Sequence, residues 1–156
     1  MEENSTEIRY FAYGSNLDVA QMRERCPQSE LLERAFLPQY SLAFGGHSKK
    51  RGGGVATIIP HENGNRVEGV MYQLTKKDLA KLDKFEGFPR QYNRMEVSVE
   101  DGAGNQHKVI TYYLNEYYPN PPSTTYYGII RTGYSIHGLD PDGLYNALQH
   151  SRNQNS

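Results

Sequence analysis

The sequence lacks the features that mark secreted, membrane-spanning or nucleic-acid-binding proteins. It has a single cysteine, Cys26, so it cannot form an intramolecular disulfide. No apolar run approaches the roughly 18 residues that a membrane span needs. Lysine and arginine number 17 against 18 aspartates and glutamates, a formal net charge of −1, which gives no electrostatic reason to expect nucleic acid or a membrane surface as a partner. The polar, acidic N-terminus is unlike a signal peptide, and we expect a cytoplasmic protein.

Motifs for metal binding and for covalent catalysis are also missing. Cys26 lies between Arg25 and Pro27 without the nearby histidine base that a reactive thiol needs. Ser15 lacks the flanking glycine of a GxSxG nucleophile motif, which makes it a weak candidate nucleophile. Neither HExxH nor another metal-ligand spacing connects the five histidines, which are His47, His61, His107, His137 and His150. We therefore predict no metal site.

Tyrosine, by contrast, is abundant: 13 tyrosines stand against 5 phenylalanines and no tryptophan. A tyrosine buries an apolar ring and keeps a polar hydroxyl at its tip, so a core rich in tyrosine can line a polar cavity. The length of 156 residues suits one ordinary domain. We expect a single domain over residues 1–150 and a frayed polar tail over residues 151–156.

Strand patterns occur mostly in pairs, with helical patterns between them. Residues 8–13 predict a buried strand, and residues 31–44 predict one bent strand or two short ones. Two hairpins are expected, which join 55–59 to 67–74 and 92–100 to 109–114. Helices are expected over 18–25, after the capping box at Thr75, over 126–131 and from Asp140. Paired strands with helices between them indicate an α+β fold with a largely antiparallel sheet.

One basic cluster interrupts the balanced charge. The triplet Lys49-Lys50-Arg51 runs directly into Gly52-Gly53-Gly54. Isolated basic triplets rarely bind nucleic acid alone, so we interpret this stretch as a solvated loop, with a loop that contacts an anion as the alternative.

The first candidate site is the stretch Tyr13-Gly14-Ser15-Asn16, which follows the first predicted strand. Gly14 permits a sharp turn, after which the backbone amides point outward at the start of a helix. Such amides bind carboxylates or phosphates and stabilise developing oxyanions. The alternative is a plain strand-to-helix turn with an Asn or Asp cap.

The second candidate site is the segment from Leu82 to Phe88. Helical spacing sets Leu82, Phe85 and Glu86 on one face, so the Glu86 carboxylate shares a buried face with apolar side chains. Asp83 and Lys84 are expected to be more easily solvated. A carboxylate among apolar side chains is either an ion-paired structural group or a functional acid or base.

These motifs stand in the order that is seen in the γ-glutamylcyclotransferases, which the chain resembles over residues 8–148. The resemblance rests on YFAYGSNL (10–17), GVATI (54–58), VEGV (67–70), LDKFEG (82–87) and PPS (121–123) followed by Tyr126. It implies a small mixed, largely antiparallel β-barrel with flanking helices, and an enzyme, a lyase that releases 5-oxoproline from a γ-glutamyl amide without a cofactor. It assigns catalysis to Glu86 and substrate binding to Tyr10, Phe11, Ala12, Tyr13, Gly14, Ser15, Asn16 and Tyr126.

The leaving amine is the open part of this prediction. The segment 88–92 departs from the glutathione enzymes of the family, and the short chain also resembles the branch that unmasks γ-glutamyl-protected antibiotic intermediates of the butirosin type. We therefore expect a small-molecule substrate with a bulky or specialised amine, such as an aminoglycoside in antibiotic biosynthesis. The alternatives are a γ-glutamyl amino acid, ε-(γ-glutamyl)-lysine, or a non-catalytic small-molecule binder on the same fold.

Overall fold

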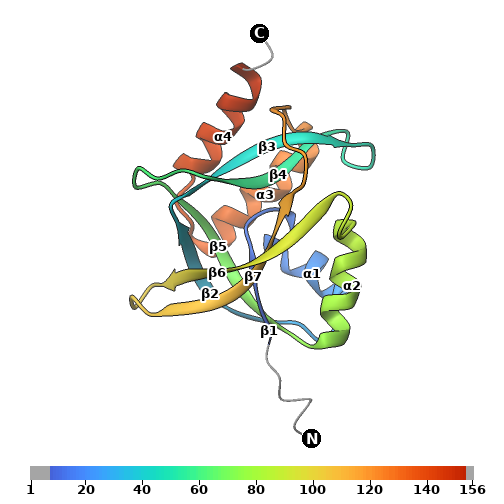
Figure 1. The fold of residues 1–156 in the computed structure, drawn as a ribbon, viewed down its shortest axis with the longest axis vertical. Helices are drawn as coiled ribbons and strands as arrows, with labels where there is room; N and C mark the ends of the chain where they lie inside the picture. The colour runs from blue at the N-terminus through green and yellow to red at the C-terminus, as the bar shows by residue number, and fades with distance from the viewer. Residues whose placement is uncertain (1–7, 154–156) are drawn as a thin grey trace, which may run out of the picture.

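The computed structural model describes residues 8–153 and contains seven strands and four α-helices over this range (Figure 1). The strands are β1 (Ile8–Ala12), β2 (Glu30–Pro38), β3 (Tyr40–Ser48), β4 (Gly53–Pro60), β5 (Arg66–Leu74), β6 (Tyr92–Asp101) and β7 (Gln106–Leu114). The helices are α1 (Val19–Arg25), α2 (Lys76–Glu86), α3 (Thr124–His137) and α4 (Asp142–Asn153), with a 3₁₀ turn, η2 (Ser15–Leu17), before α1. No helix of the described range is long and apolar enough to cross a membrane.

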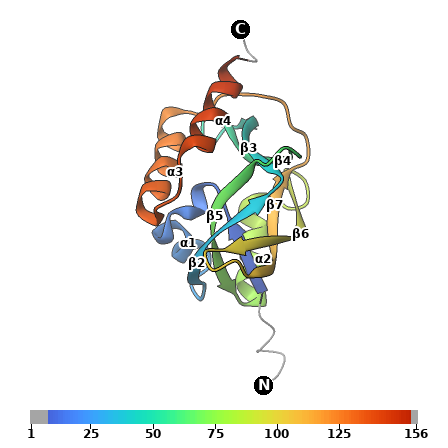
Figure 2. The ribbon, with the colours of Figure 1, turned by 90° about the vertical axis from the view of Figure 1, so that its left-hand side faces the viewer.

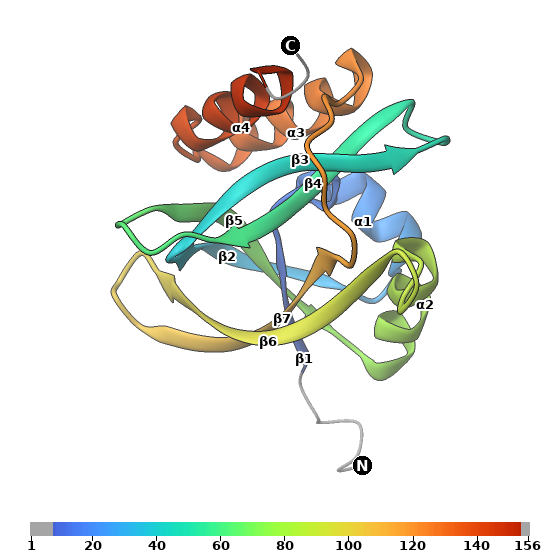
Figure 3. The same ribbon diagram turned by 45° about the horizontal axis from the view of Figure 1, so that its top comes forward.

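Five strands close into a barrel in the order β1-β5-β2-β6-β7. The pair β1–β7 is parallel and the other pairs are antiparallel, so the prediction of a mixed, largely antiparallel barrel with flanking helices is confirmed. Strands β3 and β4 form a separate two-stranded ribbon, which lies between α4 and the barrel (Figure 3). Figure 2 shows α3 and α4 together on one side of the molecule and β6 on the other.

The hairpin predicted between residues 55–59 and 67–74 is wrong. Strand β4 pairs with β3, and β5 pairs with β1 on one side and β2 on the other. Because both edges of β5 are used to close the barrel, no edge remains for β4. The turn at 61–65 therefore carries the chain from the ribbon into the barrel. The region 31–44 is two strands, which separate after Pro38 at Gln39, whose φ of 65° is left-handed.

Helix α2 forms as its capping residues predict, but its Phe85 side chain is not on the buried face. The Thr75 hydroxyl accepts a hydrogen bond from the Asp78 amide, and Gly87 ends the helix in a left-handed conformation. Leu82 is fully buried, but Phe85 is 52% exposed, so the expectation that Phe85 shares the buried face is wrong. The Arg25 guanidinium lies over the Phe85 ring instead, 4.9 Å from its centroid.

The last two helices are both longer than predicted. Ser123 caps α3 through the Tyr126 amide, and α3 continues to His137 beyond the predicted end at residue 131. Asp140 accepts a hydrogen bond from the Asp142 amide at the start of α4. The frayed tail expected from Ser151 is wrong for its first three residues, since 151–153 belong to α4 and Ser151 is fully buried. Residues 154–156 lie outside the described range.

Candidate active site

A small cavity of about 40 Å³ lies where the barrel, the ribbon and three helical elements meet. We call it the tyrosine-lined cavity because five of its ten lining residues are tyrosines. The lining residues are Tyr10, Tyr13, Gly14, Ser15, Asn16, Ala56, Glu86, Tyr92, Tyr112 and Tyr126. They come from segments that are far apart in the sequence, so only the folded chain assembles the site.

Most of the residues predicted for the site line this cavity, and two do not. Glu86, Tyr126 and the residues Tyr10 and 13–16 are all among the lining residues. Phe11 and Ala12 are fully buried in β1 and do not line it. The Phe11 ring packs against the Gly69 backbone and the Tyr13 ring instead. These two side chains therefore belong to the barrel core.

Gly14 leaves space that a larger side chain would fill. A Cβ atom at this position would lie 3.3 Å from Ala56 Cβ and 3.8 Å from the Tyr126 hydroxyl. Glycine therefore keeps the cavity open at the point where the loop, β4 and α3 approach one another.

The Glu86 carboxyl is poised between its two protonation states. Its side chain is 15% exposed and lies 3.7 Å from Arg25 Nη1. Asn16 Nδ2 donates to Glu86 Oε2 over 3.4 Å. Burial raises the pKa of Glu86 to about 7, and the Arg25 charge and the Asn16 hydrogen bond limit that rise. A carboxyl group with this pKa can both accept and donate a proton near neutral pH.

The tyrosine hydroxyls differ in how their protons are used. Three of them donate to protein acceptors: Tyr13 to Tyr112 O over 2.6 Å, Tyr92 to Ala56 O over 2.6 Å, and Tyr112 to Asp83 Oδ1 over 2.6 Å. Tyr10 accepts from Asn16 Nδ2 over 2.9 Å and Tyr126 accepts from the Ala56 amide over 3.0 Å.

No acceptor for the Tyr10 or the Tyr126 hydroxyl proton exists among residues 8–153. Burial raises the pKa of Tyr126 to about 12 and that of Tyr10 well above its usual value, so both hydroxyls keep their protons. The cavity therefore offers two neutral O–H donors to a ligand oxygen.

A polar network holds the loop beside Glu86. Asn16 is buried, and its Oδ1 accepts from Gln21 Nε2 over 2.9 Å and from Arg25 Nη1 over 3.2 Å. Gln21 Nε2 also lies 3.0 Å from Ser15 Oγ. Helix α1 carries both Gln21 and Arg25, and its N-terminal cap is Asp18. The helix after the loop therefore orients both Asn16 and Glu86.

Lys84 is exposed, as predicted, whereas Asp83 is only 18% exposed and is ion-paired rather than freely solvated. Its carboxylate accepts two hydrogen bonds from the Arg94 guanidinium, over 3.1 Å from Nε and 3.2 Å from Nη2, in addition to the bond from Tyr112. These contacts tie α2 to both β6 and β7. Asp83 therefore fixes the end of the helix that presents Glu86, one turn later in the same motif.

The sequence did not assign Ala56 or Tyr112 to the site, and it drew attention to Tyr92 only as the end of the segment 88–92, in connection with the leaving amine. Ala56 contributes backbone atoms, which residue types do not reveal, and the two tyrosines lie on the strands of a correctly predicted hairpin. The excess of tyrosine was the available signal. It indicates a polar cavity without indicating which tyrosines line it.

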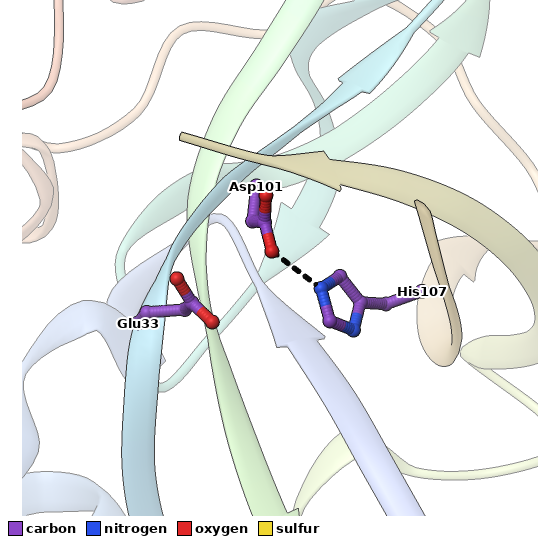
Figure 4. Close-up of side chains that lie close together, drawn as sticks. All are labelled: Glu33, Asp101 and His107. Atoms are coloured by element: carbon purple, nitrogen blue, oxygen red, sulfur yellow. Dashed lines mark hydrogen bonds and ion pairs between the residues drawn. The ribbon is translucent and has the colours of Figure 1, made fainter. Parts of the chain in front are cut away.

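One cluster of possible metal ligands lies apart from the cavity, at the turn of the β6–β7 hairpin (Figure 4). It consists of Glu33, Asp101 and His107. His107 Nε2 lies 2.7 Å from Asp101 Oδ2, and His107 Nδ1 lies 2.8 Å from Arg9 Nη1. Asp101 Oδ1 accepts from two turn amides, and its bond to His107 contributes most to lowering the pKa of Asp101 to about 2. Both imidazole nitrogens are thus occupied, and the cluster acts as a brace for the hairpin.

Comparison with known proteins identifies the family. The family model described as "Gamma-glutamyl cyclotransferase, AIG2-like" matches residues 10–133. The γ-glutamylcyclotransferase of Bos taurus is 35% identical over 142 residues, which are 88% of this chain and 75% of the relative. That of Homo sapiens is 35% identical over 135 residues, 83% of this chain and 71% of the relative. A solved structure of a γ-glutamyl cyclotransferase aligns with a TM-score of 0.82 at 30% identity, over 96% of this chain and 87% of the other. The chain belongs to the AIG2-like γ-glutamylcyclotransferase family of enzymes.

Proposed function

We propose that this protein converts a γ-glutamyl amide into 5-oxoproline and a free amine, with no cofactor, and that Glu86 carries the protons. The observation that supports this most directly is the buried Glu86 carboxyl, with a pKa of about 7, in a cavity that also offers two free phenol protons. Family membership supports the reaction class.

The reaction needs little from the protein beyond position and proton transfer. The substrate's α-amine attacks its own δ-carbonyl carbon, which forms the ring C–N bond, and the bond from that carbon to the leaving nitrogen then breaks. The attack is intramolecular, so no protein nucleophile is required. The ring nitrogen loses two protons relative to the α-ammonium group, and the departing nitrogen gains two when it leaves as an ammonium ion. Glu86 accepts a proton before attack and donates one to the leaving nitrogen, and so returns to its starting state. The second proton leaves the ring nitrogen to solvent, and the released amine takes one up from solvent.

The loop at residues 13–16 holds the γ-glutamyl unit in this proposal. The Tyr10 and Tyr126 hydroxyls donate to its oxygens, either to the α-carboxylate or to the developing oxyanion. The cavity of about 40 Å³ is small, which suits the compact glutamyl unit and leaves the amine outside. A substrate whose α-amine is acylated should not react, because the attacking nitrogen is blocked.

The amine partner is the finer part of the proposal. The expectation of an aminoglycoside rests on the segment 88–92 and on the resemblance of the short chain to the butirosin-type branch. Within that segment only Tyr92 lines the cavity. Phe88 lies under the Arg94 guanidinium, whose Cζ is 4.5 Å from the ring centroid. We therefore rank γ-glutamyl amino acids first and keep ε-(γ-glutamyl)-lysine and a γ-glutamyl-aminoglycoside as alternatives. A non-catalytic binder is disfavoured, since it would have no use for a buried carboxyl beside the ligand.

Product analysis tests this function. The protein is incubated with γ-glutamyl-alanine, glutathione, ε-(γ-glutamyl)-lysine and a γ-glutamyl-aminoglycoside, and 5-oxoproline is measured. We expect 5-oxoproline from at least the first substrate, a loss of about 10²–10⁴ in rate for Glu86→Gln, and no loss for Glu24→Gln, which changes an exposed carboxylate on α1. Absence of 5-oxoproline from all four substrates, or full activity of Glu86→Gln, contradicts the proposal.

A further inference from the structure

Arg51 reaches the active site from the loop between β3 and β4. Its Nη2 atom donates to Ser15 Oγ over 3.3 Å and to Gln21 Oε1 over 3.0 Å. Its Cζ atom lies 5.1 Å from the centroid of the Tyr126 ring. The side chain is half-buried and is not among the residues that line the tyrosine-lined cavity. Arg51 therefore lies at the outer rim, next to two of the residues that do line it.

Arg51 forms no close ion pair within the described part of the chain, although its charge is near enough to Glu86 to help limit the rise in the pKa of that carboxyl. No carboxylate oxygen of residues 8–153 lies within 4.0 Å of its guanidinium, whereas Arg25 is paired with Glu86 and Arg94 with Asp83. A guanidinium group presents a planar fork that matches a carboxylate, and charge-assisted hydrogen bonds of this kind are about twice as strong as neutral ones. Arg51 is held in place by neutral groups, so its charge remains available to an anion.

A γ-glutamyl amino acid carries two carboxylates, and the geometry distinguishes between them. The inner cavity, which we assign to the glutamyl unit, is lined by phenols, an amide, backbone and Glu86. Arg51 lies beyond this lining, next to Ser15 and Tyr126, and the leaving group must extend beyond the lining because the cavity is so small. The carboxylate within its reach is that of the leaving amino acid.

We propose that Arg51 binds the carboxylate of the leaving amino acid and so selects γ-glutamyl amino acids over γ-glutamyl amines that have no carboxylate. This inference rests on the proposed function and names the residue that reads its leaving group. Within the basic triplet, Lys49 and Lys50 are exposed, whereas Arg51 is half-buried against the site. A polycationic amine would be repelled by this guanidinium, which disfavours an aminoglycoside.

The test compares two substrates that differ only in the leaving-group carboxylate, γ-glutamyl-alanine and γ-glutamyl-ethylamine. Wild-type protein should prefer γ-glutamyl-alanine in kcat/KM. Arg51→Gln should lower kcat/KM for γ-glutamyl-alanine by about 10- to 100-fold more than kcat/KM for γ-glutamyl-ethylamine, mainly through KM. A smaller loss common to both substrates is expected, because the pKa of Glu86 rises when the Arg51 charge is removed. Arg51→Lys should recover part of the preference, because it keeps the charge and loses the fork. The matched control is Lys50→Gln, which removes the same charge one residue earlier from an exposed side chain.

The test rests on the ratio of kcat/KM for γ-glutamyl-alanine to kcat/KM for γ-glutamyl-ethylamine. A loss of activity that is common to both substrates leaves this ratio unchanged. If Arg51→Gln lowers both substrates equally and weakens inhibition by 5-oxoproline, Arg51 binds the glutamyl carboxylate and the inference is overturned. If the wild type shows no preference between the two substrates, it is also overturned. Release of 5-oxoproline from both substrates would, in either case, leave the proposed function standing.

Discussion

At the scale of single residues, the site depends on opposing influences on Glu86. Burial disfavours the charged carboxylate, and Arg25 at 3.7 Å favours it. The result is a group that is neither permanently charged nor permanently neutral near pH 7. A buried carboxyl without Arg25 would hold its proton too firmly to act as a base, and one exposed to water would be a poor acid.

This balance predicts the pH dependence of catalysis. Because the proposed mechanism requires the base form of Glu86, kcat/KM should fall about tenfold per pH unit below a pH of about 7. Removing the Arg25 charge raises the pKa of Glu86 further, so Arg25→Gln should move this acid limb to higher pH. Arg23→Gln, an exposed arginine on the same helix, should leave the limb in place. Coincident profiles for wild type and Arg25→Gln would contradict the assignment.

Tyr126 gives a second prediction at this scale. Tyr126→Phe removes the acceptor for the Ala56 amide and one of the two free phenol protons, so kcat/KM should fall by about 10- to 1000-fold. Tyr127→Phe is the matched control, since the next residue of α3 makes no hydrogen bond through its hydroxyl within the described range. Steady-state kinetics on γ-glutamyl-alanine would measure both, and equal activity of the two variants would remove Tyr126 from the site.

At the scale of elements, the position of the loop depends on how closely α3 approaches η2. Gly133 of α3 faces Leu17, and a Cβ atom on Gly133 would lie 2.6 Å from Leu17 Cβ. Leu17 is buried and directly follows Asn16, so a shift of η2 moves the side chain that contacts Glu86. The helix therefore supports the site without lining it at this point.

A pair of glycine substitutions tests this contact. Gly133→Ala should lower the free energy of unfolding by about 1–3 kcal/mol through overcrowding, and it should lower kcat as η2 moves. Gly128→Ala, in the same helix with nothing within 4 Å of the added methyl group, should instead stabilise by about 0.5–1 kcal/mol and leave kcat unchanged. Urea denaturation and steady-state kinetics measure the two effects. A stabilising Gly133→Ala would show that η2 yields at no cost.

At the scale of the whole molecule, the site makes the fold less stable above neutral pH. The folded-state pKa of Glu86 is about 7 against an ordinary 4.5, so its contribution to stability is fully present below pH 4.5 and is lost as the pH rises to about 7. The loss amounts to roughly 2–3 kcal/mol for a shift of this size. The carboxyl that we propose as the acid and base is thus kept buried at the end of α2 at the expense of stability.

Replacing Glu86 should therefore flatten the pH dependence of stability. We expect Glu86→Gln to gain roughly 2–3 kcal/mol relative to wild type between pH 5 and pH 8, measured by urea denaturation at each pH. The other titrating groups cancel in this difference. The control is Glu24→Gln, which replaces an exposed carboxylate and should have the same difference in stability between pH 5 and pH 8 as wild type. Parallel curves for Glu86→Gln and wild type would mean that burial does not raise the pKa of Glu86.

The sequence alone determined the features that depend on neighbours within a few residues. The α2 caps at Thr75 and Gly87, the β6–β7 hairpin and the strand-to-helix turn at Gly14 all follow from local hydrogen bonding and conformational preference. The same holds for the inward phase of Glu86, which helical spacing from Leu82 predicts. These elements carry the family motifs, so the fold class and the candidate acid or base were both predictable.

Only the tertiary structure decided which chemically similar groups reach the site. Strand β4 could have paired with β5, but closure of the barrel uses both edges of β5, and β4 brings Ala56 to the cavity within the ribbon instead. Within the motif at residues 10–17, the side chains of Phe11 and Ala12 are buried in the barrel core and do not line the cavity. Arg51 lies at the rim of the cavity because the β3–β4 loop brings its side chain against Ser15 and the Tyr126 ring. The strand pairing, the burial of Phe11 and Ala12 and the position of Arg51 all depend on contacts between residues that are tens of positions apart in the sequence. The local pattern of residue types does not reveal the free energies of such contacts.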